Sequence, residues 1–326
     1  MSEPISTPTV SVVIPTHQRR DRLPILLDAL EGEAAMEVVV VVNASDDGSL
    51  ELLEERAARD PRLRPMSIEE AGQVLALEAG VERARGEVIL LLDDDVIPEQ
   101  GLVAGHAERH QGQQSLVVVG YMPVAAPQPR RRGQYPVDLY SRAYERVCKE
   151  YEHDPGAILR GLWAGNVSLR RSDCIRVGLN PAERSDGYEY HEDRDLGLRC
   201  EAAGLDAVFD RRLRARHLYE RTPASFLSTS RNSGASRASV HRQHAEAIGP
   251  LPDDFFARVV PQPGRLLVRL ARLRPLYRPV RAALRLLTNL AGALRLFRLE
   301  SHAGYVLGTV EQQRGAMSAV PETASR

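Results

Sequence analysis

Five apolar residues, Val88 to Leu92, run directly into the aspartates Asp93, Asp94 and Asp95. An unbroken apolar run of this length is typical of a strand buried on both faces, as in a parallel sheet. The aspartates then lie at its carboxyl end, where open α/β sheets bind ligands. Adjacent carboxylates repel one another, so we expect a cation among them, and Mg²⁺ or Mn²⁺ takes oxygen ligands. The alternative is a solvated acidic turn, a common sequel to a strand.

The residues before and after this stretch alternate between strand and helix patterns. Apolar runs predict further strands at 10–14, 38–42 and 116–121. Apolar residues at helical spacing predict helices at 22–30 and 71–85. Strands that alternate with helices of this size predict an α/β fold with a doubly wound, mostly parallel sheet.

Composition narrows the class of protein. Hydrophobic residues make up 43% of the chain and charged residues 27%, as in ordinary soluble proteins, and the net charge of −1 selects no nucleic acid partner. The three cysteines form no CxxC pair, which indicates a reducing compartment. Residues 1–9 are polar and predict a flexible tail, and no apolar run reaches the roughly 18 residues of a membrane span. We therefore expect a cytoplasmic location.

Two segments carry a family resemblance. Val-Ser-Val-Val-Ile-Pro-Thr at 10–16 and Ala-Arg-Gly-Glu-Val-Ile-Leu-Leu-Leu-Asp-Asp-Asp at 84–95 resemble a family 2 glycosyltransferase with the Rossmann-like GT-A fold. The resemblance implies an inverting, hexosyltransferase-like enzyme that uses a nucleotide-diphosphate sugar, with a UDP-sugar favoured. It makes Asp93-Asp94-Asp95 the DxD motif, which binds the nucleotide-sugar and holds Mn²⁺ or Mg²⁺ through Asp95.

The same resemblance assigns the rest of the donor site. Pro15 and Thr16 match the loop that approaches the nucleotide, and Asn43 stands where the family usually has an aspartate that contacts the base or ribose. His217 follows a short predicted strand at 206–210 and matches a metal ligand of many GT-A enzymes. An imidazole together with a carboxylate suits Mn²⁺ as well as Mg²⁺.

On the acceptor side, the segment Trp163-Ala-Gly165-Asn166-Val-Ser-Leu-Arg resembles the Gly-Asn-x-Ser-x-Arg segment that lines the family's cleft. Trp163 is the only tryptophan; it either stacks on a sugar ring or is a core residue in a strand. Four tyrosines at 135, 140, 144 and 151 either line the cleft or pack in the core, and packing is favoured.

A second acidic segment, Tyr188 to Arg199, resembles the family's "ED" segment. An acceptor hydroxyl is a poor nucleophile until its proton is removed, and a carboxylate can act as the general base. The resemblance gives that role to Asp193, with Glu192 binding acceptor or sugar hydroxyls. The alternative is an acidic helix N-terminus, which the helix dipole favours.

The C-terminal region is basic and leucine-rich. Ten arginines and no acids lie between Asp254 and Glu300, with leucines at helical spacing, and Pro275 and Pro279 predict two or three short helices. Such helices lie on anionic membrane surfaces, or they pack on the fold or against a second subunit. The sequence leaves open a location on the inner face of the membrane, a lipid-linked acceptor and a homodimer.

We therefore predict a flexible tail at 1–9, a GT-A domain at 10–245 and a basic amphipathic helical region at 246–326. The predicted function is metal-dependent, inverting sugar transfer to a hydroxyl of a glycan, a lipid-linked compound or a small molecule. The alternative is a non-catalytic nucleotide- or glycan-binding protein on the same fold. It is motivated by Asn43 and Leu77, which stand where members of the resembled family usually have an aspartate and an arginine. A sugar-nucleotide pyrophosphorylase would need a glycine-rich loop at 15–20, which contains no glycine.

Overall fold

The computed structural model describes residues 9–35, 37–124, 126–179 and 190–319. The contacts within the chain divide it into two units, and each is described by itself. The sheet unit comprises residues 1–125, 145–183 and 196–218. The helical unit comprises residues 126–144, 184–195 and 219–326. The longest segment of the helical unit begins at residue 219. The sequence predicts the start of the C-terminal region later, at residue 246.

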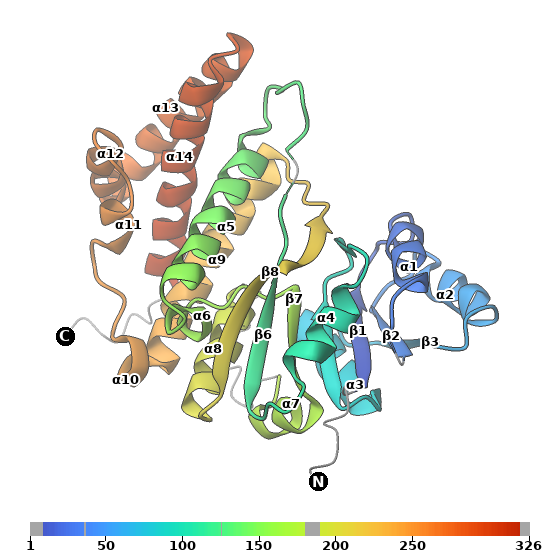
Figure 1. The fold of residues 1–326 in the computed structure, drawn as a ribbon. Helices are drawn as coiled ribbons and strands as arrows, with labels where there is room; N and C mark the ends of the chain where they lie inside the picture. The colour runs from blue at the N-terminus through green and yellow to red at the C-terminus, as the bar shows by residue number, and fades with distance from the viewer. Residues whose placement is uncertain (1–8, 36, 125, 180–189, 320–326) are drawn as a thin grey trace. The chain divides into compact units, whose positions relative to one another are not determined.

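The sheet unit is built on an eight-stranded mixed sheet in the order β3-β2-β1-β4-β7-β6-β8-β5 (Figure 1). Its strands are β1 (Val10–Thr16), β2 (Glu37–Asn43), β3 (Leu63–Ile68), β4 (Val88–Leu92), β5 (Val96–Pro98), β6 (Leu116–Tyr121), β7 (Asn166–Arg170) and β8 (Asp206–His217). The first four are parallel, as predicted, whereas β7 runs antiparallel to both β4 and β6. The predicted α/β class is confirmed, and the strand predicted at 206–210 extends to His217.

The helices before residue 219 lie between these strands along the chain. They are α1 (Leu23–Glu31), α2 (Ser49–Ala57), α3 (Gln73–Arg83), α4 (Leu102–Arg109), α5 (Tyr135–His153), α6 (Ala157–Arg160), α7 (Arg171–Val177) and α8 (Glu192–Ala202). Pro24 lies in the first turn of α1, where its missing N–H leaves no bond unmade.

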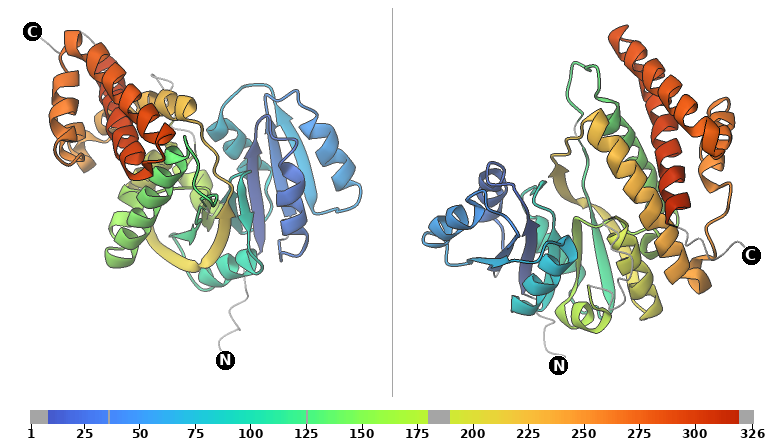
Figure 2. Two further views of the ribbon diagram at one scale, coloured as in Figure 1. Left: turned by 90° about the horizontal axis from the view of Figure 1, so that it is seen from above. Right: turned by 180° about the vertical axis from the view of Figure 1, so that it is seen from behind.

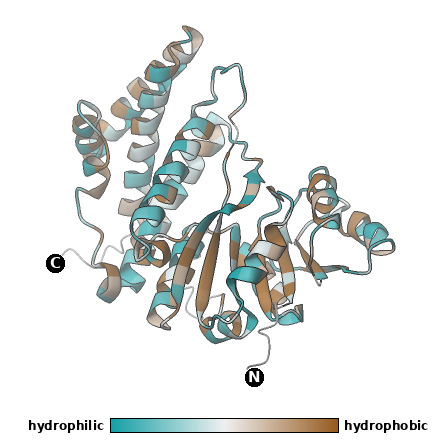
Figure 3. Ribbon diagram, in the orientation of Figure 1, coloured by the Kyte–Doolittle hydropathy of each residue, from teal (hydrophilic) through white to brown (hydrophobic). Residues whose placement is uncertain are grey.

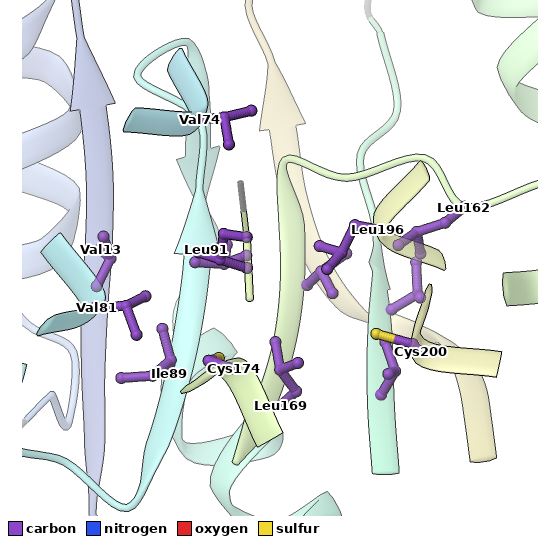
Figure 4. Packing of buried hydrophobic residues seen from close by; sticks show 14 of the residues in the cluster. Val13, Val74, Val81, Ile89, Leu91, Leu162, Leu169, Cys174, Leu196 and Cys200 are labelled. Atoms are coloured by element: carbon purple, nitrogen blue, oxygen red, sulfur yellow. The ribbon is translucent and has the colours of Figure 1, made fainter. Parts of the chain in front are cut away.

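The apolar runs are strands because both of their faces are buried. Every residue of β1, β2 and β4 is buried, and Figure 3 shows the central strands as mostly hydrophobic. Figure 4 shows Val13, Ile89 and Leu91 packing with Val81 of α3 and with Cys174 of α7. A continuous apolar run with two hydrogen-bonded neighbours is stable only inside such a layer, which fixes where β4 ends and its aspartates begin.

The helical unit contains α9 (Pro223–Gln243), α10 (Ala245–Ile248), α11 (Phe255–Arg258), α12 (Gly264–Ala271), α13 (Arg274–Ala293) and α14 (Phe297–Ser318). Helices α9 and α14 run side by side, as Figures 1 and 2 show. Their backbones meet at Gly234 and Gly315, where an added Cβ would lie 1.9 Å from the carbonyl oxygen of Gln312 and 1.8 Å from that of Arg231. No side chain fits at either position, so glycine is required for this close approach.

The prediction that prolines divide the C-terminal region into short helices is wrong. Pro275 lies in the first turn of α13, and Pro279 lies within this 20-residue helix. Pro279 cannot donate to the carbonyl of Pro275, but both residues are exposed, so water can satisfy that carbonyl. Packing of the opposite, buried side of α13 offsets the lost bond.

Three of the four tyrosines at 135–151, Tyr135, Tyr144 and Tyr151, are at most 3% exposed, which confirms that they pack. Within the described ranges, no helix is both long and apolar enough to cross a membrane.

Candidate active site

The three aspartates lie in a tight turn that joins β4 to β5. Leu92 pairs with Asn166 of β7, and the amide of Asp93 donates to the carbonyl of Gly165 at 3.1 Å. The chain then reverses, because the amide of Val96 donates to the carbonyl of Asp93 at 3.1 Å. The turn therefore presents Asp94 and Asp95 at the carboxyl end of β4.

Asp94 meets the end of the neighbouring parallel strand. The hydroxyl of Thr16, the last residue of β1, donates to Asp94 Oδ2 at 2.8 Å. Burial raises the pKa of Asp94 to about 6, with a further contribution from the charge of Asp95, although the hydrogen bond from Thr16 opposes the shift. The structure thus brings Thr16 into contact with the acidic cluster. The family resemblance had assigned both to the nucleotide-sugar site.

Asp95 meets the end of β8. His217 Nε2 lies 3.2 Å from Asp95 Oδ1, and the imidazole is only 8% exposed. Burial by itself would raise the pKa of Asp95, but the hydrogen bond and charge of His217 and the charges of Arg19 and Arg22 outweigh burial, so the net pKa is lowered. Asp95 is therefore a carboxylate at neutral pH.

Arginine is the cationic residue that the sequence analysis missed. Arg19 Nη2 lies 3.9 Å from Asp95 Oδ2, and Arg19 Nε lies 4.0 Å from Asp94 Oδ1. Arg22 donates to the carbonyl of Leu218 at 3.3 Å, beside His217. The guanidinium group of Arg19 thus supplies part of the positive charge expected among the aspartates. The available signal was the position of Arg19 in the loop directly after β1.

Asn43 ends β2 and is 7% exposed. Its Oδ1 accepts from the amide of Gly72 at 3.0 Å, and its carbonyl lies 2.7 Å from His17 Nδ1. The amide oxygen supplies the acceptor that an aspartate would supply, but without a charge. Pro15 pairs with Val41 in the β1–β2 ladder and is buried. It is therefore a packed residue of the sheet, directly before Thr16.

Asp93 and Gly165 form a close backbone contact. Gly165 has φ +112°, and an added Cβ would lie 2.6 Å from Asp93 Oδ2. Gln73 at the start of α3 donates to Asp93 Oδ1 at 3.2 Å. Gln73 thus holds one carboxylate oxygen of Asp93, and Gly165 lies close to the other.

Asn166 does not fit its predicted role in substrate binding. It is 0% exposed; its Oδ1 lies 2.9 Å from His106 Nε2, and its Nδ2 donates to the carbonyl of Leu213 at 3.1 Å. Because Asn166 is a strand residue that points into the packed layer, the side chain ties β7 to α4 and β8.

The network around Asn166 includes two buried histidines that the sequence analysis did not single out. His106 Nδ1 and His110 Nε2 each lie 2.8 Å from Ser168 Oγ. Burial lowers the pKa of both histidines to about 4, so both are neutral at pH 7.

Trp163 lies in the segment between α6 and β7 and is only partly buried. The reading of Trp163 as a core residue in a strand is therefore wrong, because β7 begins three residues later, at Asn166. Its contact with a sugar ring stays a prediction.

The second acidic segment lies at the start of α8, and Tyr188 and Glu189 fall outside the described residues. Glu192 and Asp193 occupy the first turn of the helix, as the alternative of an acidic N-terminus requires, and the amide of Arg194 donates to Asp193 Oδ1 at 2.7 Å. Asp195 is 2% exposed and lies 2.7 Å from His244 Nε2, so it holds α8 to the end of α9. Glu192 and Asp193 are half-buried, in contrast to Asp195.

The donor atoms suit a divalent cation bound jointly with a ligand. In the part of the chain that the structure describes, no three His, Cys, Asp or Glu side chains gather to hold a metal ion by themselves. Asp95 and His217 nevertheless provide one carboxylate and one imidazole in contact. A metal ion held by this pair would have coordination positions left for phosphate oxygens, as Mg²⁺ and Mn²⁺ sites on nucleotides require.

Comparisons with known proteins bear on the family and the fold of the chain. The sequence model of the family described as "Glycosyl transferase family 2" matches residues 11–176. The uncharacterized glycosyltransferase YfnE of Bacillus subtilis is 32% identical over 145 residues, which cover 44% of this chain and 34% of YfnE. An undecaprenyl-phosphate 4-deoxy-4-formamido-L-arabinose transferase of Pseudomonas aeruginosa is 33% identical over 165 residues, 48% of each chain. The chain thus matches less than half the length of these relatives.

Solved structures show the same fold at low identity. The mannosyltransferase PcManGT of Pyrobaculum calidifontis, solved with GDP-Man and Mn²⁺, aligns with a TM-score of 0.56 and 17% identity over 93% of this chain and 86% of its own. S. aureus TarS 1-349 in complex with UDP aligns with a TM-score of 0.50 and 15% identity over 94% of this chain and 91% of its own.

Proposed function

The chain belongs to glycosyl transferase family 2 and has the GT-A fold, and we propose that it moves a sugar from a nucleotide-diphosphate sugar to an acceptor hydroxyl. The observation that carries the proposal is the contact of Asp95 with His217 in the turn after β4. This pair lies where α/β sheets bind ligands, and its oxygen and nitrogen donors match the cation that a diphosphate needs.

On the donor side, Asp95 and His217 would hold Mn²⁺ or Mg²⁺, which when bound neutralises charge on the leaving diphosphate. Thr16 and Arg19 provide a hydroxyl and a guanidinium group beside the same acids. Asn43, Pro15, Asp93 and Asp94 complete the proposed nucleotide-sugar site, with a UDP-sugar as the first donor to test. The GDP-Man and Mn²⁺ bound to PcManGT and the UDP bound to TarS support a donor of this class.

On the acceptor side, Asp193 is the proposed general base, and it removes the proton of the attacking hydroxyl. Glu192 is proposed to bind acceptor or sugar hydroxyls, and Trp163 and Gly165 to line the acceptor side. One displacement at the anomeric carbon, from the face opposite the leaving diphosphate, inverts its configuration. The three cysteines are buried and form no disulfide, which supports a reducing, cytoplasmic location for the reaction.

A two-stage experiment tests this function. A thermal-shift screen of nucleoside diphosphates and their sugars, with and without Mn²⁺, identifies the donor. Turnover of that donor is then measured with a glycan, a small alcohol and a polyprenyl phosphate; the third acceptor is included because matched relatives are named as undecaprenyl-phosphate transferases. NMR of the product reports the anomeric configuration, and retention would refute the single displacement. Donor binding without turnover on any acceptor would favour the non-catalytic alternative.

A further inference from the structure

Helix α13 has apolar residues on its packed side and also on its exposed surface. Leu284, Thr288 and Ala291 are at most 4% exposed and belong to the side that packs with α12 and α14. Four other leucines at the C-terminal end of this helix are exposed: Leu286 at 60%, Leu287 at 41%, Leu290 at 51% and Leu294, the C-terminal cap residue, at 68%. We call these four residues the leucine face. An amphipathic helix in a monomeric protein normally turns polar residues to water, so this face calls for a partner.

The leucine face is part of a larger apolar surface. Nine of the twelve large hydrophobic residues that are exposed in the described ranges lie between residues 259 and 299. Five of these lie outside the face, on α12 and α14 or in the segments between α11 and α14: Val259, Leu266, Leu273, Leu296 and Leu299. Figure 3 shows hydrophobic and hydrophilic segments alternating along α12 and α13. Scattered single leucines need no explanation, but this concentration does.

Arginines form a second stripe along α13, about 100° around the helix from Leu286 of the leucine face, and we call this stripe the arginine edge. Arg274, Arg278 and Arg285 are exposed and lie four and seven residues apart, so they project from the same side of α13. No acid occurs between Asp254 and Glu300. Among the ion pairs of the described residues, only one involves an arginine of α13, and it joins Arg281 to Glu311 of α14. The arginine edge therefore carries a positive charge.

A hollow on the arginine edge adds a place for an anionic group. It has a volume of about 330 Å³ and is lined by Arg231 of α9 and by Tyr277, Arg278, Arg281 and Ala282 of α13. Because Glu311 offsets only one of its three guanidinium groups, the hollow keeps a net positive charge. Arginine forks of this kind bind phosphate oxygens in pairs.

We propose that the leucine face and its arginine edge dock the protein on an anionic lipid bilayer. Phosphates of the headgroups would pair with Arg278 and Arg285, and the leucines would enter the boundary with the acyl chains. A second copy of the chain would bring another arginine-rich face against the first, and the like charges would repel. A nucleic acid would leave the leucines in water. The proposal concerns location and does not depend on the proposed sugar transfer.

The first test is co-sedimentation of the full chain with vesicles of phosphatidylcholine, with and without a quarter of phosphatidylglycerol. We expect binding to the anionic vesicles only, and weaker binding at high salt. Arg278→Gln and Arg285→Gln should each weaken partition about fivefold. Arg59→Gln removes an exposed arginine from the turn after α2 of the sheet unit and is the matched control that should leave binding unchanged.

The second test removes the apolar contribution. Leu286→Ser with Leu290→Ser should weaken partition about tenfold or more, without a change in the unfolding temperature, because both side chains are exposed. The control is Ile175→Ser with Ile25→Ser, two isoleucines exposed by 57% and 46% outside this surface. All three native cysteines are buried, so Leu290→Cys provides a single site for an environment-sensitive dye. Its emission should shift to the blue on anionic vesicles, and that of Ile175→Cys should not.

Three outcomes would overturn the proposal. One is equal binding to vesicles with and without phosphatidylglycerol, or to neither. Another is unchanged binding by the double serine variant. The third is a doubled mass in light scattering that the same variant abolishes, which would assign the leucine face to a dimer interface.

Discussion

His217 Nε2 lies 3.2 Å from Asp95 Oδ1, so the last residue of β8 contacts the turn that follows β4. Two backbone features hold this contact in place. Val96 pairs with His217 in the β5–β8 ladder, and the amide of Leu218 donates to the carbonyl of Asp95 at 2.7 Å. Both side chains are therefore fixed by the sheet before any ligand binds, and such preorganisation favours tight binding.

Asp95→Asn should abolish Mn²⁺-dependent donor binding and leave the fold intact. The amide can still accept the hydrogen bond from His217, but it carries no charge for the cation. Loss of an outer partner costs about 10–100-fold in metal affinity, and loss of a ligand should cost more. Calorimetry with nucleoside diphosphate and Mn²⁺ measures the effect.

The control for Asp95→Asn is Glu99→Gln, which neutralises a half-exposed acid directly after β5 that pairs with Arg214. It should bind donor and Mn²⁺ as the parent protein does. Unchanged affinity in the Asp95 variant would remove this residue from the metal site.

Asp193→Asn should keep donor binding and lose about 10²–10⁴-fold in transfer rate, because only the proposed base is removed. Single-turnover measurements separate this effect from binding. Asp195→Asn is the comparison: it disturbs the bond to His244 and should lower stability more than the rate of transfer. A variant at position 193 that retained most of its turnover would show that another residue is the base.

Gly165→Ala should destabilise the protein by about 1–3 kcal/mol. A Cβ at φ +112° is strained, and it would lie 2.6 Å from Asp93 Oδ2, so the first aspartate must move. Urea unfolding measures the loss. Gly161→Ala in the same segment is the control, because its Cβ would lie 3.4 Å from the nearest atom at an ordinary φ. Equal stability of the two variants would contradict the proposed contact with Asp93.

His106→Gln should make stability less dependent on pH between about 6.5 and 4. Burial lowers the pKa of His106 from its ordinary value of 6.5 to about 4. As the pH falls through this window the unfolded state takes up the proton first, so the contribution of His106 is complete above pH 6.5 and is lost toward pH 4. Between pH 7 and 5 the parent should lose about 1–2 kcal/mol more than the variant.

Urea unfolding of both proteins at pH 7 and 5 provides the values. The comparison with the variant is needed because His110 adds a change of the same sign, whereas the raised pKa of Asp94 adds one of opposite sign. Parallel pH profiles of the two proteins would mean that His106 is not buried as a neutral imidazole.

The sequence by itself determined the α/β class, most strand positions and the place of the acids. An apolar run such as Val88–Leu92 can be stable only when it is covered on both faces, so its identity as a buried strand is a local property. Asp93 to Asp95 then fall at its carboxyl end whatever the rest of the chain does. The arginine-rich, acid-free C-terminal region is also visible without a structure.

Only the tertiary structure decided which distant side chains meet. The contacts of Thr16 and Arg19 with the aspartates and the inward direction of Asn166 follow from strand order and register, which no short window of sequence contains. The same holds for α13, where Leu284 is buried by packing and Leu286 and Leu290 are exposed to water. Periodicity places leucines on a helix, but which of them are buried depends on the neighbouring helices, because burial is a property of contacts between elements.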